Sequence, residues 1–165
     1  MSNDWCTVVT KHFKICLECG RTLLMDGPAN RFEAGLDRDG NEIVMEGLRN
    51  WLMTPRERRQ ERLADFLIVL EEFVTDPSDL TEEELKHFQD DLWEIKAGTL
   101  RIIFSGGRCN GGNQSRVVKL NERVGEMARE NKCCRGLIAF GKSGKSAGRS
   151  KRDLAVAIAR EDKKR

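Results

Sequence analysis

Residues 92–104, LWEIKAGTLRIIF, are the stretch of the sequence from which the fold is predicted. Two runs of strand-forming residues flank a turn signal at 97–99, which is the pattern of a tight antiparallel hairpin. Apolar residues alternate onto one face of the second run, namely Leu100, Ile102 and Phe104. Arg101 therefore lies on the other face, because successive strand residues point to opposite sides. A further apolar run at 135–142, RGLIAFGK, predicts a third strand.

Two helices are predicted ahead of this hairpin. Residues 54–57, TPRE, combine a capping threonine, a proline suited to the first helical position and a glutamate that can close a capping box. An apolar stripe at helical spacing follows, so we expect a helix over residues 55–75, ended near Asp76-Pro77. Thr81 and Glu84 form a second capping box, which predicts a short helix to about residue 90.

The order of these elements predicts an α+β domain, with two N-terminal helices packed on one face of a small antiparallel sheet. The segments around a turn signal at 37–41 predict another hairpin over residues 31–47. A C-terminal helix is expected to bury the stripe Leu154, Ala157 and Ile158. We assign the domain to residues 31–165, with residues 1–30 as an N-terminal extension and residues 105–134 as an insertion between two strands.

Charge divides the chain into an acidic and a basic part. Residues 1–95 hold 11 Lys and Arg against 21 Asp and Glu, a net charge of −10, whereas residues 96–165 hold 18 against 6, a net of +12. Clustered Lys and Arg displace counterions from phosphates, so the basic part predicts binding to nucleic acid or to a nucleic-acid machine. Ordinary solvated surface charge is the alternative.

The cellular compartment of the protein is predicted from its hydropathy and from its N-terminal residues. No apolar run approaches the ~20 residues that a bilayer span requires, which excludes a transmembrane helix. The N-terminal sequence lacks the basic flank and long apolar stretch of a secretory signal. We therefore expect a cytoplasmic protein with no membrane partner, whose six cysteines are reduced thiols or metal ligands.

Four residues near the N-terminus raise the question of a metal. Cys6, His12, Cys16 and Cys19 together offer a Cys3His set, which tetrahedral zinc accepts. A structural zinc in the extension is one hypothesis. The other is that the thiols act as small hydrophobes, and the unusual spacing of the four residues favours it.

Four short pieces of the sequence resemble, in order and, apart from the insertion at residues 105–134, in spacing, the RelE/ParE toxin superfamily and in particular its HigB-like, phage-associated branch. They are LWEIK at 92–96, LRIIF at 100–104, AFGK at 139–142 and DLAVA at 153–157. The resemblance covers roughly residues 45–105 and 135–165. It implies a RelE-like fold and a toxin that cleaves messenger RNA, usually on the ribosome, and that is neutralised by a cognate antitoxin protein.

The resemblance also implies a mechanism and a set of site residues. In such enzymes the 2′-hydroxyl attacks the adjacent phosphate, and cationic side chains stabilise the phosphorane, so no cofactor is required for catalysis. The candidate catalytic residues are Arg101, Lys142 and Lys145. The residues expected to bind nucleic acid are Arg135, Arg149, Lys151 and Arg152.

A non-catalytic protein is the alternative function. The same fold can bind a host factor such as DNA gyrase without cleaving RNA. The chain has no tyrosine and no histidine after His87, so it lacks residues that commonly serve as acid, base or stacking partner. The missing tyrosine and the insertion at residues 105–134 favour the binding protein.

Overall fold

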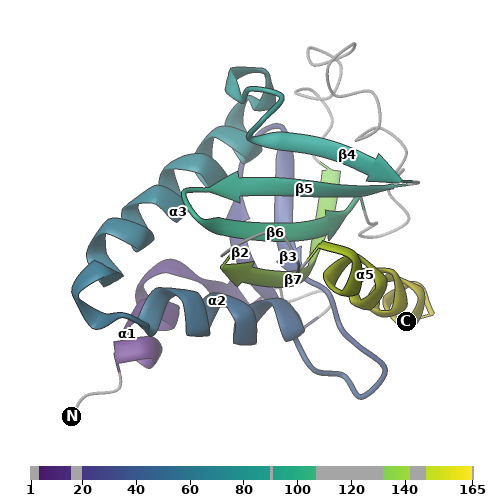
Figure 1. Ribbon diagram of the computed structural model, residues 1–165, viewed down its shortest axis with the longest axis horizontal. Helices are drawn as coiled ribbons and strands as arrows, with labels where there is room; N and C mark the ends of the chain where they lie inside the picture. The colour runs from purple at the N-terminus through teal and green to yellow at the C-terminus, as the bar shows by residue number, and fades with distance from the viewer. Residues whose placement is uncertain (1–3, 16–19, 90, 107–131, 142–147, 165) are drawn as a thin grey trace.

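The computed structural model describes residues 4–15, 20–89, 91–106, 132–141 and 148–164 (Figure 1). The architecture is α+β, with one mixed sheet in the order β1-β2-β3-β7-β6-β5-β4. The strands are β1 (Lys14–Ile15), β2 (Thr22–Asp26), β3 (Asn30–Ala34), β4 (Leu85–Gln89), β5 (Leu92–Ala97), β6 (Leu100–Ser105) and β7 (Lys132–Gly141). The helices are α1 (Asp4–His12), α2 (Ile43–Met53), α3 (Arg59–Thr75) and α5 (Gly148–Lys163), with short 3-10 helices η1 (Arg56–Arg58) and η2 (Pro77–Asp79).

The hairpin predicted from residues 92–104 is confirmed. β5 and β6 pair without interruption, from Leu92 opposite Ser105 to Ala97 opposite Leu100. Gly98 in the turn has a φ of 62°, a left-handed conformation that glycine adopts without steric conflict. The alternation along β6 is confirmed as well, because Leu100, Ile102 and Phe104 join the core under α2 and α3, whereas Ile103 packs on the side of α5.

The sheet is larger than predicted and it is not purely antiparallel. β3 runs parallel to β7, and β1 and β2 extend the sheet beyond β3. The pairing of β7 with β6 is irregular between Ile103 and Phe104, and only the first part of β7, up to Gly136, pairs with β3. Beyond this point α2 packs against β7, and Gly47 makes the approach possible because a Cβ there would overlap the carbonyl oxygen of Ala139.

The helix predicted over residues 55–75 is confirmed in its extent as η1 followed by α3, which ends at Thr75 before Asp76 in extended backbone. Its predicted start is wrong, because no side chain caps η1 or α3 and the α-helix begins only at Arg59. The hairpin predicted over residues 31–47 is wrong. Its first part forms β3, but its second part begins α2. The physical reason is the spacing of the residues that α2 buries, which recur at helical intervals: Val44, Leu48, Trp51 and Leu52.

The helix predicted from Thr81 is also wrong, although its capping bonds exist. The backbone N–H of Thr81 donates to Glu84 Oε1 at 2.9 Å, and that of Glu84 donates to Thr81 Oγ1 at 3.2 Å. These bonds close a turn, after which the chain forms the edge strand β4. A short isolated helix is marginal, so backbone pairing with β5 and burial of Leu85 decide the conformation.

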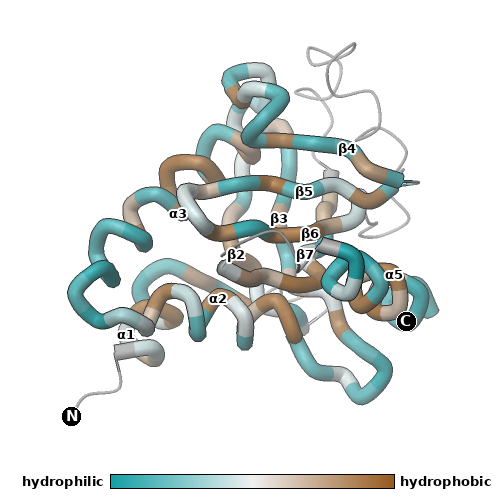
Figure 2. Tube along the Cα trace, viewed as in Figure 1, coloured by the Kyte–Doolittle hydropathy of each residue, from teal (hydrophilic) through white to brown (hydrophobic). Residues whose placement is uncertain are grey.

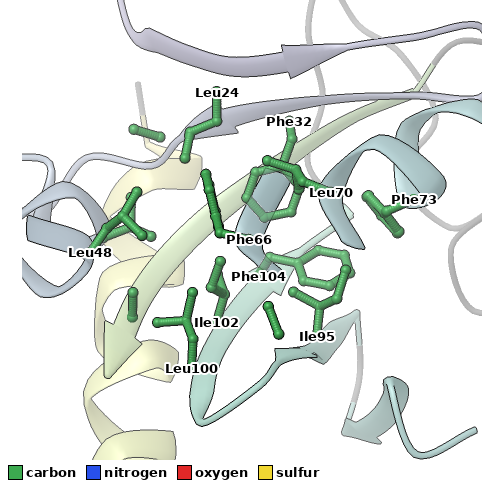
Figure 3. Close-up of a cluster of buried hydrophobic side chains, with 14 of the residues drawn as sticks. Leu24, Phe32, Leu48, Phe66, Leu70, Phe73, Ile95, Leu100, Ile102 and Phe104 are labelled. Atoms are coloured by element: carbon green, nitrogen blue, oxygen red, sulfur yellow. The ribbon is translucent and has the colours of Figure 1, made fainter. Parts of the chain in front are cut away.

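The main core lies between the sheet and the helices α2 and α3 (Figure 3). At its centre the rings of Phe32, Phe73 and Phe104 contact one another with centroids 5.1 to 5.7 Å apart. Figure 2 shows apolar residues along β6 and β7 and hydrophilic residues along the loop between β3 and α2. No helix in the described part of the chain is long and apolar enough to cross a membrane.

The helices α2 and α3 share one face of the sheet, whereas the C-terminal helix α5 packs on the opposite face. Its buried apolar residues are Ala155, Ile158 and Ala159, which pack with Leu137 and Ile138 of β7 in a second cluster. The predicted stripe is therefore shifted, and Leu154 is 44% exposed. Small alanine side chains let the helix approach the strand closely, and this packing outweighs the larger apolar side chain next to them.

Candidate nucleic-acid interface

Basic and aromatic side chains share the face of the sheet that α5 covers only in part. The register places Lys96 of β5, Arg101 of β6 and Phe140 of β7 opposite one another in a single row. Opposed residues of antiparallel strands project their side chains to the same side, about 5 Å apart. Ile103, two residues after Arg101, packs on the side of α5, so the row lies on that face.

A second row on the same face contains opposite charges. Lys86 of β4 lies opposite Glu94 of β5, and Glu94 lies opposite Ile103. Glu94 is two residues from Lys96 on the same strand, so its carboxylate is placed between two lysines. The two rows together bring three cations and one carboxylate to this side of the described strands.

The guanidinium of Arg101 is held in place without being neutralised by a described carboxylate. Its Nη1 donates hydrogen bonds to the carbonyl oxygens of Gly98, at 2.8 Å, and Leu100, at 3.0 Å. Both acceptors belong to the β5–β6 turn and its first strand residue, so the tight hairpin itself orients the side chain. A fixed guanidinium with remaining donors is well suited to bind a phosphate.

The first turns of α5 add two further cations, each lying against an aromatic ring of the sheet. Lys151 Nζ is 5.4 Å from the ring centroid of Phe140, and Arg152 Cζ is 4.9 Å from that of Phe88 in β4. Both distances are within the range of cation–π attraction. We call this surface the basic face, and it consists of Lys86, Lys96, Arg101, Lys151 and Arg152 with Phe88 and Phe140. Arg149 is exposed at the beginning of α5.

Arg135, predicted to bind nucleic acid, lies in a buried ion cluster. Its Nη1 is 3.1 Å from Asp162 Oδ2 and its Nε is 3.7 Å from Glu33 Oε1, while Arg21 approaches Asp162 Oδ1 at 2.5 Å. Burial lowers the pKa of Arg135, but Asp162 and Glu33 outweigh this effect, so the pKa is raised. The Arg135 side chain is 12% exposed and holds α5 on the sheet, so it is not part of the basic face.

The remaining predicted residues are only partly within the described chain. Lys142 and Lys145 lie outside the described residues and follow β7 directly in the sequence. Of the four candidate zinc ligands, Cys6 and His12 belong to α1, and Cys16 and Cys19 lie outside the described residues. The described part of the chain contains no group of three or more side chains that could hold a metal ion. The zinc site stays a prediction.

Four members of the basic face were not predicted from the sequence, namely Lys86, Phe88, Lys96 and Phe140. Lys96 could have been found, because a hairpin with Gly98 and Thr99 in its turn places residue 96 opposite residue 101. Phe140 could not, because its place beside Arg101 depends on the pairing of β6 with a strand that begins at residue 132.

A scan against protein-family models found no family that matches this chain. A search of curated proteins likewise found no match.

Proposed function

We propose that this protein binds RNA on the basic face and cleaves it without a metal, in the manner of RelE/ParE-like toxins. The observation that supports this most directly is the row of Lys96, Arg101 and Phe140, with Lys151 lying against the Phe140 ring. Cations alternating with an aromatic ring suit single-stranded RNA, whose phosphates bind the cations and whose bases stack on rings.

The cleavage step requires groups that this face can provide. The 2′-oxygen attacks the adjacent phosphorus, the bond to the 5′-oxygen breaks, and the products are a 2′,3′-cyclic phosphate and a 5′-hydroxyl. Arg101 supplies positive charge where negative charge develops on the phosphorane. In this proposal Glu94 accepts the proton of the 2′-hydroxyl, and the ammonium of Lys96 donates one to the leaving 5′-oxygen. Lys142 and Lys145 remain predicted contributors.

The order of elements also supports the proposal. The resembling toxins have two helices before the strands that carry the motif pieces, and α2 and α3 precede β5 and β6 here. The fourth piece, at 153–157, lies in α5, whose first turns carry Lys151 and Arg152. The cognate antitoxin remains a proposed partner, and the ribosome a proposed site of action.

The test is cleavage of RNA by the purified protein in the presence of a chelator, with the termini of the products identified by mass spectrometry. Arg101→Ala is expected to lower the cleavage rate about 100-fold or more, the effect of removing a preorganised charge stabiliser. Arg49→Ala, which removes an exposed arginine of α2, is the matched control. Undiminished cleavage by folded Arg101→Ala would show that the site is wrong.

One observation favours the non-catalytic alternative. His87 packs against Trp93, with ring centroids 5.0 Å apart, and Trp93 belongs to the core under α2 and α3 rather than to the basic face. His12 is in α1. If the protein binds a host factor such as DNA gyrase instead, its expression will induce the DNA-damage response and leave messenger RNA intact. Arrest of translation with cut messages supports the ribonuclease, and the double variant Arg101→Ala, Lys142→Ala should relieve that arrest.

A further inference from the structure

A cavity of about 790 Å³ lies beside the basic face, between α2, the end of β7 and the beginning of α5. Phe140 and Lys151 line it and also belong to the basic face, so the two are continuous. The volume exceeds that of a single nucleobase and lies in the range of pockets that take small ligands, so it leaves room for the attached ribose and phosphate.

Two charged residues of the cavity suit a phosphate or a flat aromatic ligand. The guanidinium of Arg62 lies over the ring of Trp51, 5.1 Å from its centroid, and its Nη1 donates to the carbonyl oxygens of Trp51 and Thr54, both at 2.7 Å. Trp51 is itself fixed, because its Nε1 donates to Thr99 Oγ1 at 2.9 Å. Arg62 is thus held rigidly, and Lys151 is the second cation of the lining.

Glu46 is the one carboxylate among the described residues that line the cavity, and it is exposed on α2. A carboxylate repels phosphate and accepts hydrogen bonds, so within an RNA strand, whose bases are uncharged, the group that it recognises is a neutral N–H donor. Guanine presents two adjacent donors, N1–H and N2–H, which match the two oxygens of a carboxylate. Adenine and cytosine present an amino group beside a ring acceptor, which a carboxylate repels, and uracil presents a single N–H between two carbonyls.

We propose that this cavity binds a guanine base of the RNA that lies on the basic face, and that Glu46 recognises its N1–H and N2–H edge. Arg62 and Lys151 attract the phosphates next to that base, and the side chain of Asn50 lines the same cavity as a further hydrogen-bonding group. The inference rests on the proposed function, because the base reaches the cavity as part of an RNA strand. It adds a preference for one base to a surface that otherwise binds the backbone.

The test is fluorescence anisotropy with labelled 2′-O-methyl RNA octamers, which lack the free 2′-hydroxyl needed for cleavage. The octamers are oligouridylate and two versions with a single central guanosine or inosine, the latter lacking the 2-amino group. We expect the guanosine octamer to bind roughly tenfold more tightly than the inosine octamer, the effect of one charge-assisted hydrogen bond. Glu46→Gln should reduce this ratio to about twofold or less, and Glu71→Gln, at an exposed position of α3, should leave it unchanged.

The outcomes separate the two proposals. Tight binding of every octamer with equal affinity for guanosine and inosine overturns the guanine pocket and leaves the RNA-binding face intact. A tenfold preference that survives in Glu46→Gln overturns the role of Glu46. Absence of binding to any octamer overturns the proposed function, and the guanine pocket with it.

Discussion

The two faces of the sheet differ in what covers them. Under α2 and α3 the face is closed by large apolar side chains, and Phe32, Phe73 and Phe104 contact one another at its centre. On the opposite face α5 buries a shorter seam of apolar residues and leaves charged side chains at the surface beside it. The first face holds the fold together, and the second is available to a ligand. The main core lies under the first face, so exposed side chains on the second can change with less effect on stability.

The thin seam under α5 raises the question of what holds this helix in place. Asp162, near its C-terminal end, binds Arg21 and Arg135 and accepts a hydrogen bond from the backbone N–H of Leu36 at 3.0 Å. Arg21 precedes β2 and Arg135 belongs to β7, so the cluster joins the two ends of the chain. The opposite end of α5, with Lys151 and Arg152, carries part of the basic face.

The largest expected difference between the two faces concerns their phenylalanines. Phe104→Ala removes a fully buried ring and should lower the free energy of unfolding by about 4 kcal/mol, from lost burial and the cavity left behind. Phe88→Ala removes a partly buried ring of the basic face and should lower it by about 1 kcal/mol. Urea unfolding measures both. Equal losses would mean that the two faces contribute alike to stability.

The second largest effect on stability is expected where α5 is attached to the sheet. Asp162→Asn removes a charge that pairs with the buried Arg21 and with Arg135, and breaking a buried ion pair in this way lowers stability by about 3 kcal/mol. Glu161→Gln, one residue earlier and paired with Lys164 at the surface, should change it by about 0.5 kcal/mol or less. Thermal unfolding distinguishes the two variants, and similar midpoints would contradict the anchoring role of Asp162.

A smaller effect on stability, with a clear effect on binding, is expected on the basic face. The double variant Lys96→Ala, Arg101→Ala should leave the free energy of unfolding within about 1 kcal/mol, because both side chains are only half-buried. If each contacts one phosphate, the slope of log K against log salt should become shallower by about 1.4, at ~0.7 per phosphate of a single strand. An unchanged slope would place the RNA elsewhere.

The smallest effect concerns the thiol of Cys134, which is buried in the core between the sheet and the helices α2 and α3. Burial and, secondarily, the Glu33 carboxylate raise its pKa far above the ordinary thiol value. The thiol therefore stays protonated in the folded protein, and iodoacetamide at pH 8.5 should modify exposed Cys6 much faster than Cys134, as peptide mass spectrometry would show. As the pH rises above the pKa of the unfolded thiol, the unfolded state loses its proton first, so stability falls. Alkylation of Cys134 in the native protein would indicate that the core between the sheet and the helices α2 and α3 opens.

Local signals were enough for part of the fold. The β5–β6 hairpin follows from alternation and a glycine turn, and the end of α3 follows from Asp76-Pro77, because these effects act over a few residues. Local signals failed where a segment was ambiguous. The capping box at Thr81 is formed, yet pairing with β5 turned the residues after it into β4. The stripe of α5 was shifted, because the helix phase depends on how closely β7 can be approached.

By itself, the sequence determined the α+β class, the central hairpin, the third strand and the basic character of the second part of the chain. Only the tertiary structure decided which cations lie together. Arg101 and Lys151 were candidates from the sequence, but their shared neighbour Phe140 depends on pairing between β6 and β7, and Arg135 was drawn into an ion cluster by residues 33 and 162. Such contacts join residues far apart along the chain, and their energies depend on burial and register, which no local pattern contains.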